Sequence, residues 1–384
     1  MKPFIVHIPR LRTLLHRCGL ERRHADPRWT NVSAMRPALQ AMADPQGWVF
    51  SREQALTAGY TEREIKALTR PDGDWAVVRL GIYCERALLN SLDPRSRWLL
   101  KDRAAVVSAR RPVTMSHDSA ARLLEIDTLD PPTPASHLTL YGPRGTRTNS
   151  GLTRHRDLLP LCVERVDGLV ATSYARTALD IARWHGYRHG LVAIDSVRHL
   201  GVPLSDLEAE LERMRHHPHI ARARAAVADS DTGAESVLET LGRELVASLG
   251  IGDVRTQFAV RIVGGRVVWC DMRVGCHLFE CEGKLKLAPP DRGGVASEPP
   301  EDVVWRQQGR RTDICAEGFG MSRIVWADCF EPGWEKARDR LRKEYAVTEA
   351  RFGRVPAPHL LAFAEAHPRR TTSRLWLPGM DTAA

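Results

Sequence analysis

The sequence predicts a mixed α/β (α+β) fold divided among several domains. Three observations lead to this prediction: residues 35–86 have a helix, helix, helix, hairpin pattern, residues 98–185 mix helical and strand-like segments, and residues 235–282 combine one helix with alternating strands. With 384 residues and 43% hydrophobic content, the chain is long enough to bury more than one core.

The first segment differs from the rest of the chain. Residues 1–34 carry arginine, histidine and proline without a helical or strand period, and a well-patterned segment begins at Met35. We therefore expect a disordered basic leader at 1–34, or a true start at Met35; an organelle transit peptide is the alternative that the composition favours least. Neither a signal-peptide pattern nor a run of about 20 apolar residues is present, so we expect a cytoplasmic protein without a membrane partner.

The next segment, residues 35–90, has strong local signals. Ser51 with Gln54 and Thr61 with Glu64 have capping-box spacing, which predicts two short helices separated by Gly59. A turn at 71–74 then leads into an apolar strand that Gly81 interrupts. Short helices around a glycine turn, followed by a hairpin, are typical of a winged-helix DNA-binding domain.

Four basic residues are candidates for contact with double-stranded DNA. They lie on or beside the second helix and the wing, which would approach the duplex, and they are Arg63, Lys66, Arg70 and Arg79. Surface solubility explains each of them singly almost as well, and Arg70 alternatively ends the helix. The net charge of +9 is compatible with phosphate binding, but it is too small over this length to decide the question.

The middle domain is predicted at 91–228, with a helical linker at its end. Ser116, His117 and Asp118 are consecutive, so they cannot form a catalytic triad among themselves, and we expect Ser116 to cap the helix that follows. The basic run at 213–217 predicts a solvated face or linker, with phosphate contact as the alternative. The expected elements are helices at 98–109, 117–124, 174–184 and 204–214 and a strand at 137–141.

The third domain is predicted at 229–346 and a loose, proline-rich tail at 347–384. Gly264-Gly265 between alternating segments is typical of a β-hairpin. The expected elements are helices at 235–249, 303–317 and 334–345 and strands at 256–263, 266–274, 277–282 and 322–326.

Carboxylates in this domain have the pattern of a metal site. Glu235 lies at a helix start, Asp271 on the second hairpin strand, and Glu280 and Glu282 share one face of the next strand. If Asp271 comes up beside Glu280, the oxygens would hold a hard divalent cation, for which Mg²⁺ is the natural candidate. Such an ion activates water for phosphodiester cleavage, and Lys284 or Lys286, on the same strand phase, would add electrostatic support.

Each carboxylate also has a structural explanation. Thr232 and Glu235 fit a capping box, so Glu235 alternatively satisfies helix-end amides. Glu280 and Glu282 alternatively lie on a solvent-facing strand edge. Asp271 is harder to explain in this way because aspartate disfavours strand interiors.

The cysteines do not predict a metal site. The eight cysteines contain no C-x-x-C pair, and no pair of histidines has zinc-finger spacing. Cys270, Cys276 and Cys281 lie in apolar, strand-like sequence, where a free cysteine behaves as a small buried hydrophobe.

Most of the chain, about 38–345, resembles a known family. Gly47-Trp48-Val49-Phe50-Ser51-Arg52-Glu53-Gln54-Ala55, with 61–65 and 80–83, resembles the winged helix of AbiEi-type antitoxins of type IV toxin-antitoxin systems. Ser116-His117-Asp118-Ser119-Ala120-Ala121 and 174–180 are similar to the middle part of the same actinobacterial family. The resemblance implies an operator-binding regulator with a cognate toxin as a possible partner.

The third domain is similar to Vsr-like nuclease domains, a branch of the PD-(D/E)xK restriction-endonuclease fold. Ala234-Glu235-Ser236 resembles the first helix, Asp271 the metal aspartate, and 279–286 the Glu-x-Asp-Gly-x-x-Lys strand. The resemblance implies Asp271, Glu280 and Glu282 as metal ligands. The chain departs from the pattern at Glu282, where aspartate is usual, and at Gln307 and Gln308, where Glu and Lys are common.

Two functions follow from these observations. The first is a Mg²⁺-dependent DNA endonuclease that its winged helix brings to DNA. The second is an AbiEi-type antitoxin or transcriptional regulator whose nuclease-fold domain no longer cuts, because lost charge beside the metal would weaken catalysis. Both bind double-stranded DNA, and they differ in chemistry.

Overall fold

The computed structural model describes residues 35–158, 162–282 and 309–369, and it shows the mixed α/β, multidomain fold that the sequence predicts. Strands of the described residues form three sheets, of three, six and four strands. The chain separates into two compact units. Unit 1 holds the described residues up to Ala193 and Ser205–Ala225, and unit 2 holds Ile194–Leu204 and the described residues from Ala226 onward.

Unit 1 begins with the predicted succession of helices and a hairpin. Both capping boxes are confirmed: the Ser51 side chain accepts from the Gln54 N–H, and the Thr61 side chain accepts from the Glu64 N–H. Trp75 lies at the centre of the core, with its ring centroid 4.7 Å from that of Phe50. The elements are α2 (Pro37–Ala43), η3 (Asp44–Gln46), β1 (Phe50–Ser51), α3 (Arg52–Thr57), α4 (Glu62–Leu68), β2 (Trp75–Arg79) and β3 (Ile82–Glu85), with the strand order β1-β3-β2.

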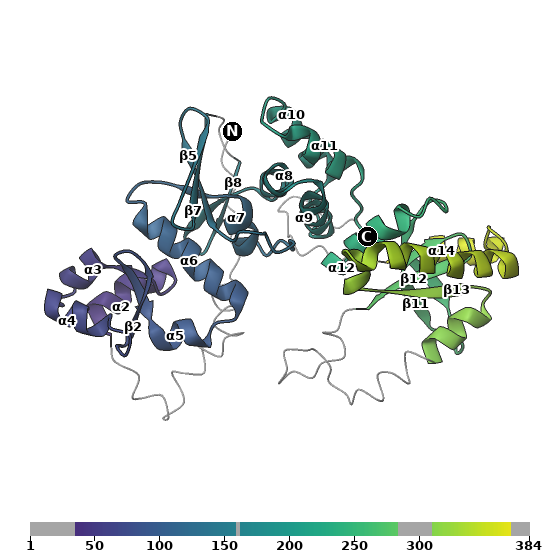
Figure 1. Ribbon diagram of the computed structural model, residues 1–384, viewed down its shortest axis with the longest axis horizontal. Coiled ribbons are helices and arrows are strands. Elements are labelled where there is room, and N and C mark those ends of the chain that lie inside the picture. Colours follow the sequence, from purple (N-terminus) through teal and green to yellow (C-terminus); the bar gives the residue numbers. More distant parts are fainter. Residues whose placement is uncertain (1–34, 159–161, 283–308, 370–384) are drawn as a thin grey trace, which may run out of the picture. The chain divides into compact units, whose positions relative to one another are not determined.

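A shared helix joins this segment to the rest of unit 1. α5 (Arg86–Ser91) is followed by α6 (Pro94–Ser108), whose Leu100 and Ala104 pack into one core with Ile82 of β3. The same helix also contacts β5, and Figure 1 shows it between the two sheets. The winged-helix and middle segments, expected as separate domains, therefore belong to one compact unit.

The middle segment is built on a six-stranded mixed sheet. Its strand order is β6-β7-β5-β4-β9-β8, with β5–β7 and β4–β9 parallel and the other pairs antiparallel. The helices α7 (His117–Leu123) and α8 (Tyr174–His185) contact each other, and α7 also packs on β5. The strands are β4 (Thr114–Met115), β5 (Ser136–Tyr141), β6 (Gly145–Asn149), β7 (Leu152–Asp157), β8 (Val163–Val166) and β9 (Leu169–Thr172).

One expectation for the middle segment is wrong, and a second, the solvated face at 213–217, holds only for Arg213, Arg215 and His216, which are exposed. Ser116 occupies the position before α7, but its side chain makes no capping hydrogen bond; its hydroxyl instead accepts from Thr139. The basic run 213–217 is not simply solvated, because Met214 and His217 are buried and His217 reaches Asp157. In both cases a tertiary partner replaced the local or solvent contact that was expected. The remaining helices are α9 (Tyr187–His199), α10 (Leu204–Arg213) and α11 (Ile220–Ala228).

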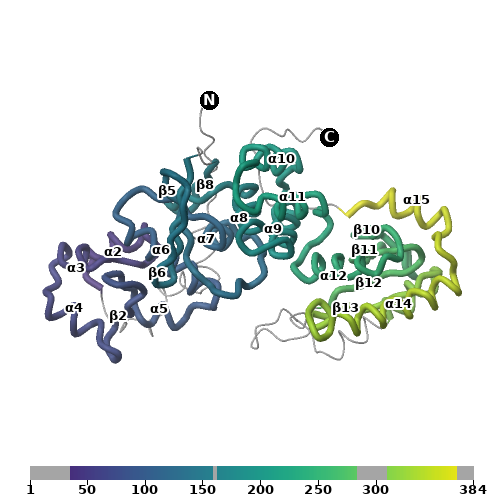
Figure 2. The backbone as a smooth tube through the Cα atoms, turned by 45° about the horizontal axis from the view of Figure 1, so that its top comes forward, coloured from purple at the N-terminus to yellow at the C-terminus, as the bar shows by residue number. Residues whose placement is uncertain are grey.

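Unit 2 has a four-stranded sheet covered on two sides. The order is β10-β11-β12-β13, where the Gly264-Gly265 hairpin joins the first two strands and β12–β13 is parallel. Figure 2 shows the strands between α15 and α14. The elements are α12 (Val237–Ala247), β10 (Arg255–Arg261), β11 (Val267–Val274), β12 (His277–Glu282), β13 (Gly320–Val325), η6 (Trp326–Cys329), α14 (Gly333–Phe352) and α15 (Pro358–Ala366), with a further helical stretch at 309–316.

The tail expected to be loose from 347 is ordered as far as the structure describes it. α14 continues to Phe352, and α15 packs its Leu360 and Leu361 against the core of Phe258, Cys270 and Leu278. Pro358 stands in the first turn of α15, where its missing N–H costs nothing. The proline content that suggested a loose tail is therefore compatible with a helix start.

Two smaller predictions can be compared with the described residues. Cys270, Cys276 and Cys281 are buried and free, as expected. Among the helices of the described part of the chain, none combines the length and the apolar character needed to cross a bilayer.

Candidate functional site

The four basic residues predicted to contact DNA lie along the helix and hairpin of unit 1. Arg63 and Lys66 are exposed and three residues apart, so they share a face of α4. Arg70 follows that helix and is exposed, while its carbonyl oxygen accepts a hydrogen bond from Arg86. Arg79 ends β2 and is half-buried.

A basic cleft lies on the middle sheet of the same unit. It has a volume of about 730 Å³. Within the described part of the chain no carboxylate lines it, so its charge is uniformly positive. It is lined by Arg111, Arg144, Arg147, Arg154 and Arg156, together with Leu138, Leu140 and the backbone of the β5–β6 turn.

Two arginines of this cleft lie opposite each other on neighbouring strands. Arg147 of β6 and Arg154 of β7 are direct cross-strand partners, an arrangement that like charges normally destabilise. Burial lowers the pKa of Arg79, and the positive charge of Arg154 lowers it further. Arg79, at the end of β2, is therefore close enough to Arg154 of the cleft to interact with it electrostatically, and a polyanion would offset the repulsion between them.

The predicted carboxylates of unit 2 have separate partners. The Asp271 Oδ2 atom accepts the Cys281 N–H at 2.7 Å, Glu280 pairs with Arg310 at 3.2 Å, and Glu282 pairs with Arg323 at 3.2 Å. An arginine beside each glutamate offsets the negative charge that would attract a cation. Asp271, Glu280 and Glu282 thus do not meet in a three-ligand group among the described residues.

Glu235 does not have the role expected for it. Its carboxylate binds the Arg369 guanidinium, with 2.7 Å between Nη2 and Oε2, and the cap of α12 is Ser236. Sequence reasoning missed Glu239, one turn further on. The Ser236-x-x-Glu239 spacing was the available signal, since the Ser236 side chain accepts the Glu239 N–H and Glu239 reaches back to the Glu235 N–H.

Glu239 and Asp271 form the carboxylate pair of this unit. Burial raises the pKa of the Glu239 carboxyl to about 7, and the charge of Asp271 acts in the same direction. A buried carboxyl group next to a second carboxylate is suited to one side of a hard-cation site. The fit to Mg²⁺ is therefore partial, and it involves a glutamate other than the predicted ones.

Some predicted residues lie outside the described ranges. Lys284 and Lys286, the candidates for electrostatic support, belong to them, as do Gln307 and Gln308.

Comparison with known proteins gives the following relatives. No protein-family model matches the chain. Two Mycobacterium tuberculosis proteins, both described by name as uncharacterized, are 29% identical to it over 170 residues; one is from strain CDC 1551 / Oshkosh and one from strain ATCC 25618 / H37Rv. The match covers 43% of this chain and 61% of each relative.

Proposed function

We propose that the chain is a DNA-binding protein that holds the duplex through unit 1. The observation that carries this proposal is the cleft lined by five arginines and, among the described residues, by no carboxylate; one of these arginines, Arg154, also acts electrostatically on Arg79 at the end of β2. Arginine guanidinium groups neutralise phosphates, and such contacts supply most of the affinity for nucleic acid. Arg63 and Lys66 are exposed on α4, the helix that the resemblance assigns to the operator, and they would add phosphate contacts there.

The charge arrangement supports a polyanion over a single small anion. The arginines are spread over the β5–β6 turn, β6, β7 and the segment before β4, and two of them oppose each other across strands. A folded protein tolerates such repulsion at a cost, which several phosphates of one backbone would offset together. Phosphate contacts of this kind fix the orientation of the protein on the duplex. Side chains of α4 would then contact the edges of the bases.

The test is a titration of the full chain with a fluorescently labelled duplex at several salt concentrations. Arg147→Ala and Arg154→Ala should each weaken binding to all sequences alike and reduce the slope of log K against log salt by about 0.9. Arg351→Ala, which removes an exposed arginine of α14 in unit 2, is the matched control and should bind as the parent does. Unchanged affinity in both cleft variants, or no binding by the parent, would contradict the proposal.

A second candidate is Mg²⁺-dependent cleavage of the bound DNA. The observation in its favour is that the charge of Asp271 on β11 raises the pKa of the buried Glu239 carboxyl on α12. Mg²⁺ held there would supply a Lewis acid and an activated water. The residues of this chain would hold the ion through Glu239 and Asp271, while the Cys281 N–H orients the aspartate.

Plasmid DNA with Mg²⁺ separates the nuclease from the regulator. For a nuclease we expect nicking or linearisation by the parent and its loss in Asp271→Asn and Glu239→Gln, with DNA binding retained in both. A parent that binds DNA but leaves the plasmid intact would favour an AbiEi-type regulator with a degenerate nuclease fold. Cleavage that persists in both variants would show that another site or a contaminant is responsible.

A further inference from the structure

Three buried histidines of unit 1 form a group that does not line the basic cleft, although the cavity beside them shares Arg144 and Arg156 with that cleft. His117 begins α7, His137 lies on β5 and His155 on β7, and one potential ligand atom of each lies within 4.8 Å of those of the other two. The parallel pairing of β5 with β7 puts His137 and His155 on the same side of the sheet, because their registers differ by two.

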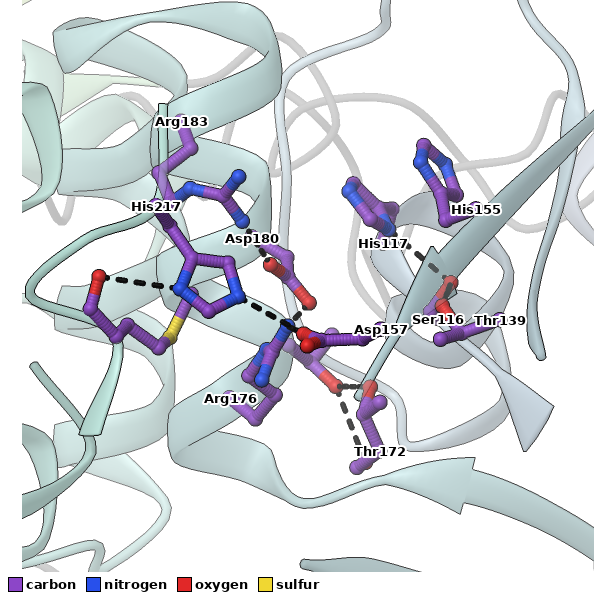
Figure 3. A network of polar contacts seen from close by, with 12 residues as sticks. Ser116, His117, Thr139, His155, Asp157, Thr172, Arg176, Asp180, Arg183 and His217 are labelled. Atoms are coloured by element: carbon purple, nitrogen blue, oxygen red, sulfur yellow. Dashed lines mark hydrogen bonds and ion pairs between the residues drawn. The ribbon is translucent and has the colours of Figure 1, made fainter. Parts of the chain in front are cut away.

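His117 is held in an unusual backbone conformation. Its φ is +50°, in the left-handed region that non-glycine residues seldom adopt. Such a conformation is unfavourable for a non-glycine residue and persists where the surrounding structure requires it. Here it begins a helix whose other side chains are almost all buried, and it directs the imidazole toward His155, as Figure 3 shows.

Each imidazole is oriented by an oxygen on its other ring nitrogen. The pairs are His117 Nδ1 with Ser116 Oγ at 3.1 Å, His137 Nε2 with Asp118 Oδ2 at 3.2 Å, and His155 Nδ1 with Thr146 Oγ1 at 3.4 Å. Asp118 Oδ2 is also 2.8 Å from His185 Nε2, so the carboxylate is fixed between two imidazoles. A carboxylate behind a histidine is the arrangement that orients a metal-bound imidazole and raises its basicity.

The group opens onto a cavity of about 370 Å³, into which His117, His155 and Trp184 project. The opposite wall is a buried ionic network, in which Arg176 binds Asp157 and Asp180 at 2.8 Å and His217 also binds Asp157 at 2.8 Å (Figure 3). A fourth ligand could therefore reach an ion at the histidines from the cavity. Arg144, Arg156 and Arg183 also line it.

We propose that His117, His137 and His155 bind one divalent transition-metal ion, with the fourth position facing this cavity. Three imidazoles and an open position are the ligand set of catalytic zinc sites, and imidazole prefers Zn²⁺ and similar ions to Mg²⁺. Binding would replace the hydrogen bond between His137 Nδ1 and His155 Nε2, which are 3.0 Å apart. It would also turn the His117 and His155 rings, which stack with centroids 3.9 Å apart, because a lone pair lies in its ring plane.

The test is calorimetric titration of the full chain, stripped with a chelator, with Zn²⁺ alone. We expect one ion per chain, and binding that is about 100-fold weaker or absent in His137→Ala and His155→Ala. Asp118→Asn should weaken binding by about 10-fold to 100-fold, as loss of an outer partner does elsewhere. His359→Ala, an exposed histidine of α15 in unit 2, is the matched control and should bind as the parent does.

A second measurement keeps the test decisive if the buried variants fail to fold. X-ray absorption of the Zn²⁺-loaded parent counts the imidazoles around the ion, and three are expected. The proposal is overturned by a parent that binds no Zn²⁺, by fewer imidazoles, or by histidine variants that fold and bind normally. Binding that is lost only in Asp271→Asn would place the ion at the carboxylates and overturn it equally.

Discussion

Single residues decide the electrostatics of both units. In unit 1, arginines of the cleft are left without carboxylates in its lining, whereas Arg176 is surrounded by them. In unit 2, Glu239 and Asp271 bring negative charges together within a desolvated region. The arginine cleft of unit 1 would therefore be stabilised by a bound anion. The carboxylates of unit 2 would be stabilised by a bound cation or a proton.

The Glu239 carboxyl should make the stability of the protein depend on pH. Because its pKa is about 7 in the folded protein and near 4.5 when unfolded, the folded state holds the proton more tightly. Its contribution is fully present below about pH 4.5 and is lost as pH rises to about 7, on the order of 3 kcal/mol in all. Glu239→Gln should therefore be more stable than the parent at pH 8 and similar to it near pH 4.

Denaturant unfolding at several pH values, with a chelator present, measures this difference. Glu317→Gln, an exposed glutamate of the same unit, should leave the pH dependence of the parent unchanged. A parent and a Glu239→Gln variant with parallel curves from pH 4 to pH 8 would rule out the raised pKa.

At the scale of elements, the helix starts and the hairpin that depend on local sequence were predicted correctly. The packing of α15 on a sheet distant in sequence was not predicted. The capping boxes of α3 and α4 and the Gly264-Gly265 hairpin depend on residues within four positions of one another, so the sequence contains all the information. α15 was missed because Leu360 and Leu361 are held by the core of a sheet about 100 residues earlier.

The packing of α12 on its sheet provides an element-scale prediction. A Cβ atom at Gly242 would lie 2.7 Å from Cys281 Sγ and 3.1 Å from Met272 Cε, both buried. Gly242→Ala should therefore destabilise the protein by about 1–3 kcal/mol, despite the better helix propensity of alanine. Thermal unfolding tests this against Gly309→Ala, where a Cβ meets nothing within 4 Å; equal melting temperatures for the two variants would refute tight packing at α12.

For the candidate sites, prediction from sequence succeeded only in part. Asp271 was singled out because aspartate is unusual within a strand, and the structure places it against Glu239. The histidines were missed because 18 or more residues separate them and only the β5–β7 pairing and the start of α7 bring them together. Ser116, His117 and Asp118 were rejected as a catalytic triad because they are consecutive, and their contacts with Thr139, His155 and His185 could not be read from the sequence.

At the scale of the whole molecule, two compact units carry different chemistries. Unit 1 holds the basic cleft and the histidine group, and unit 2 holds the carboxylate pair. Binding of DNA and binding of Zn²⁺ can therefore be measured separately from cleavage, since different variants remove each of them. A protein that binds DNA but does not cut it would still leave the histidine group to be explained.

The sharing of α6 limits how the protein can be dissected. A fragment that stops at residue 90 would keep Val49, Ala76 and Ile82 but lose Leu100 and Ala104, which complete their core. A fragment that extends to residue 108 would restore that core. It would, however, expose to solvent the side of α6 that contacts β5. The smallest fragment that keeps both sides of α6 covered is thus the entire first unit, and shorter fragments would aggregate through whichever apolar side had been uncovered.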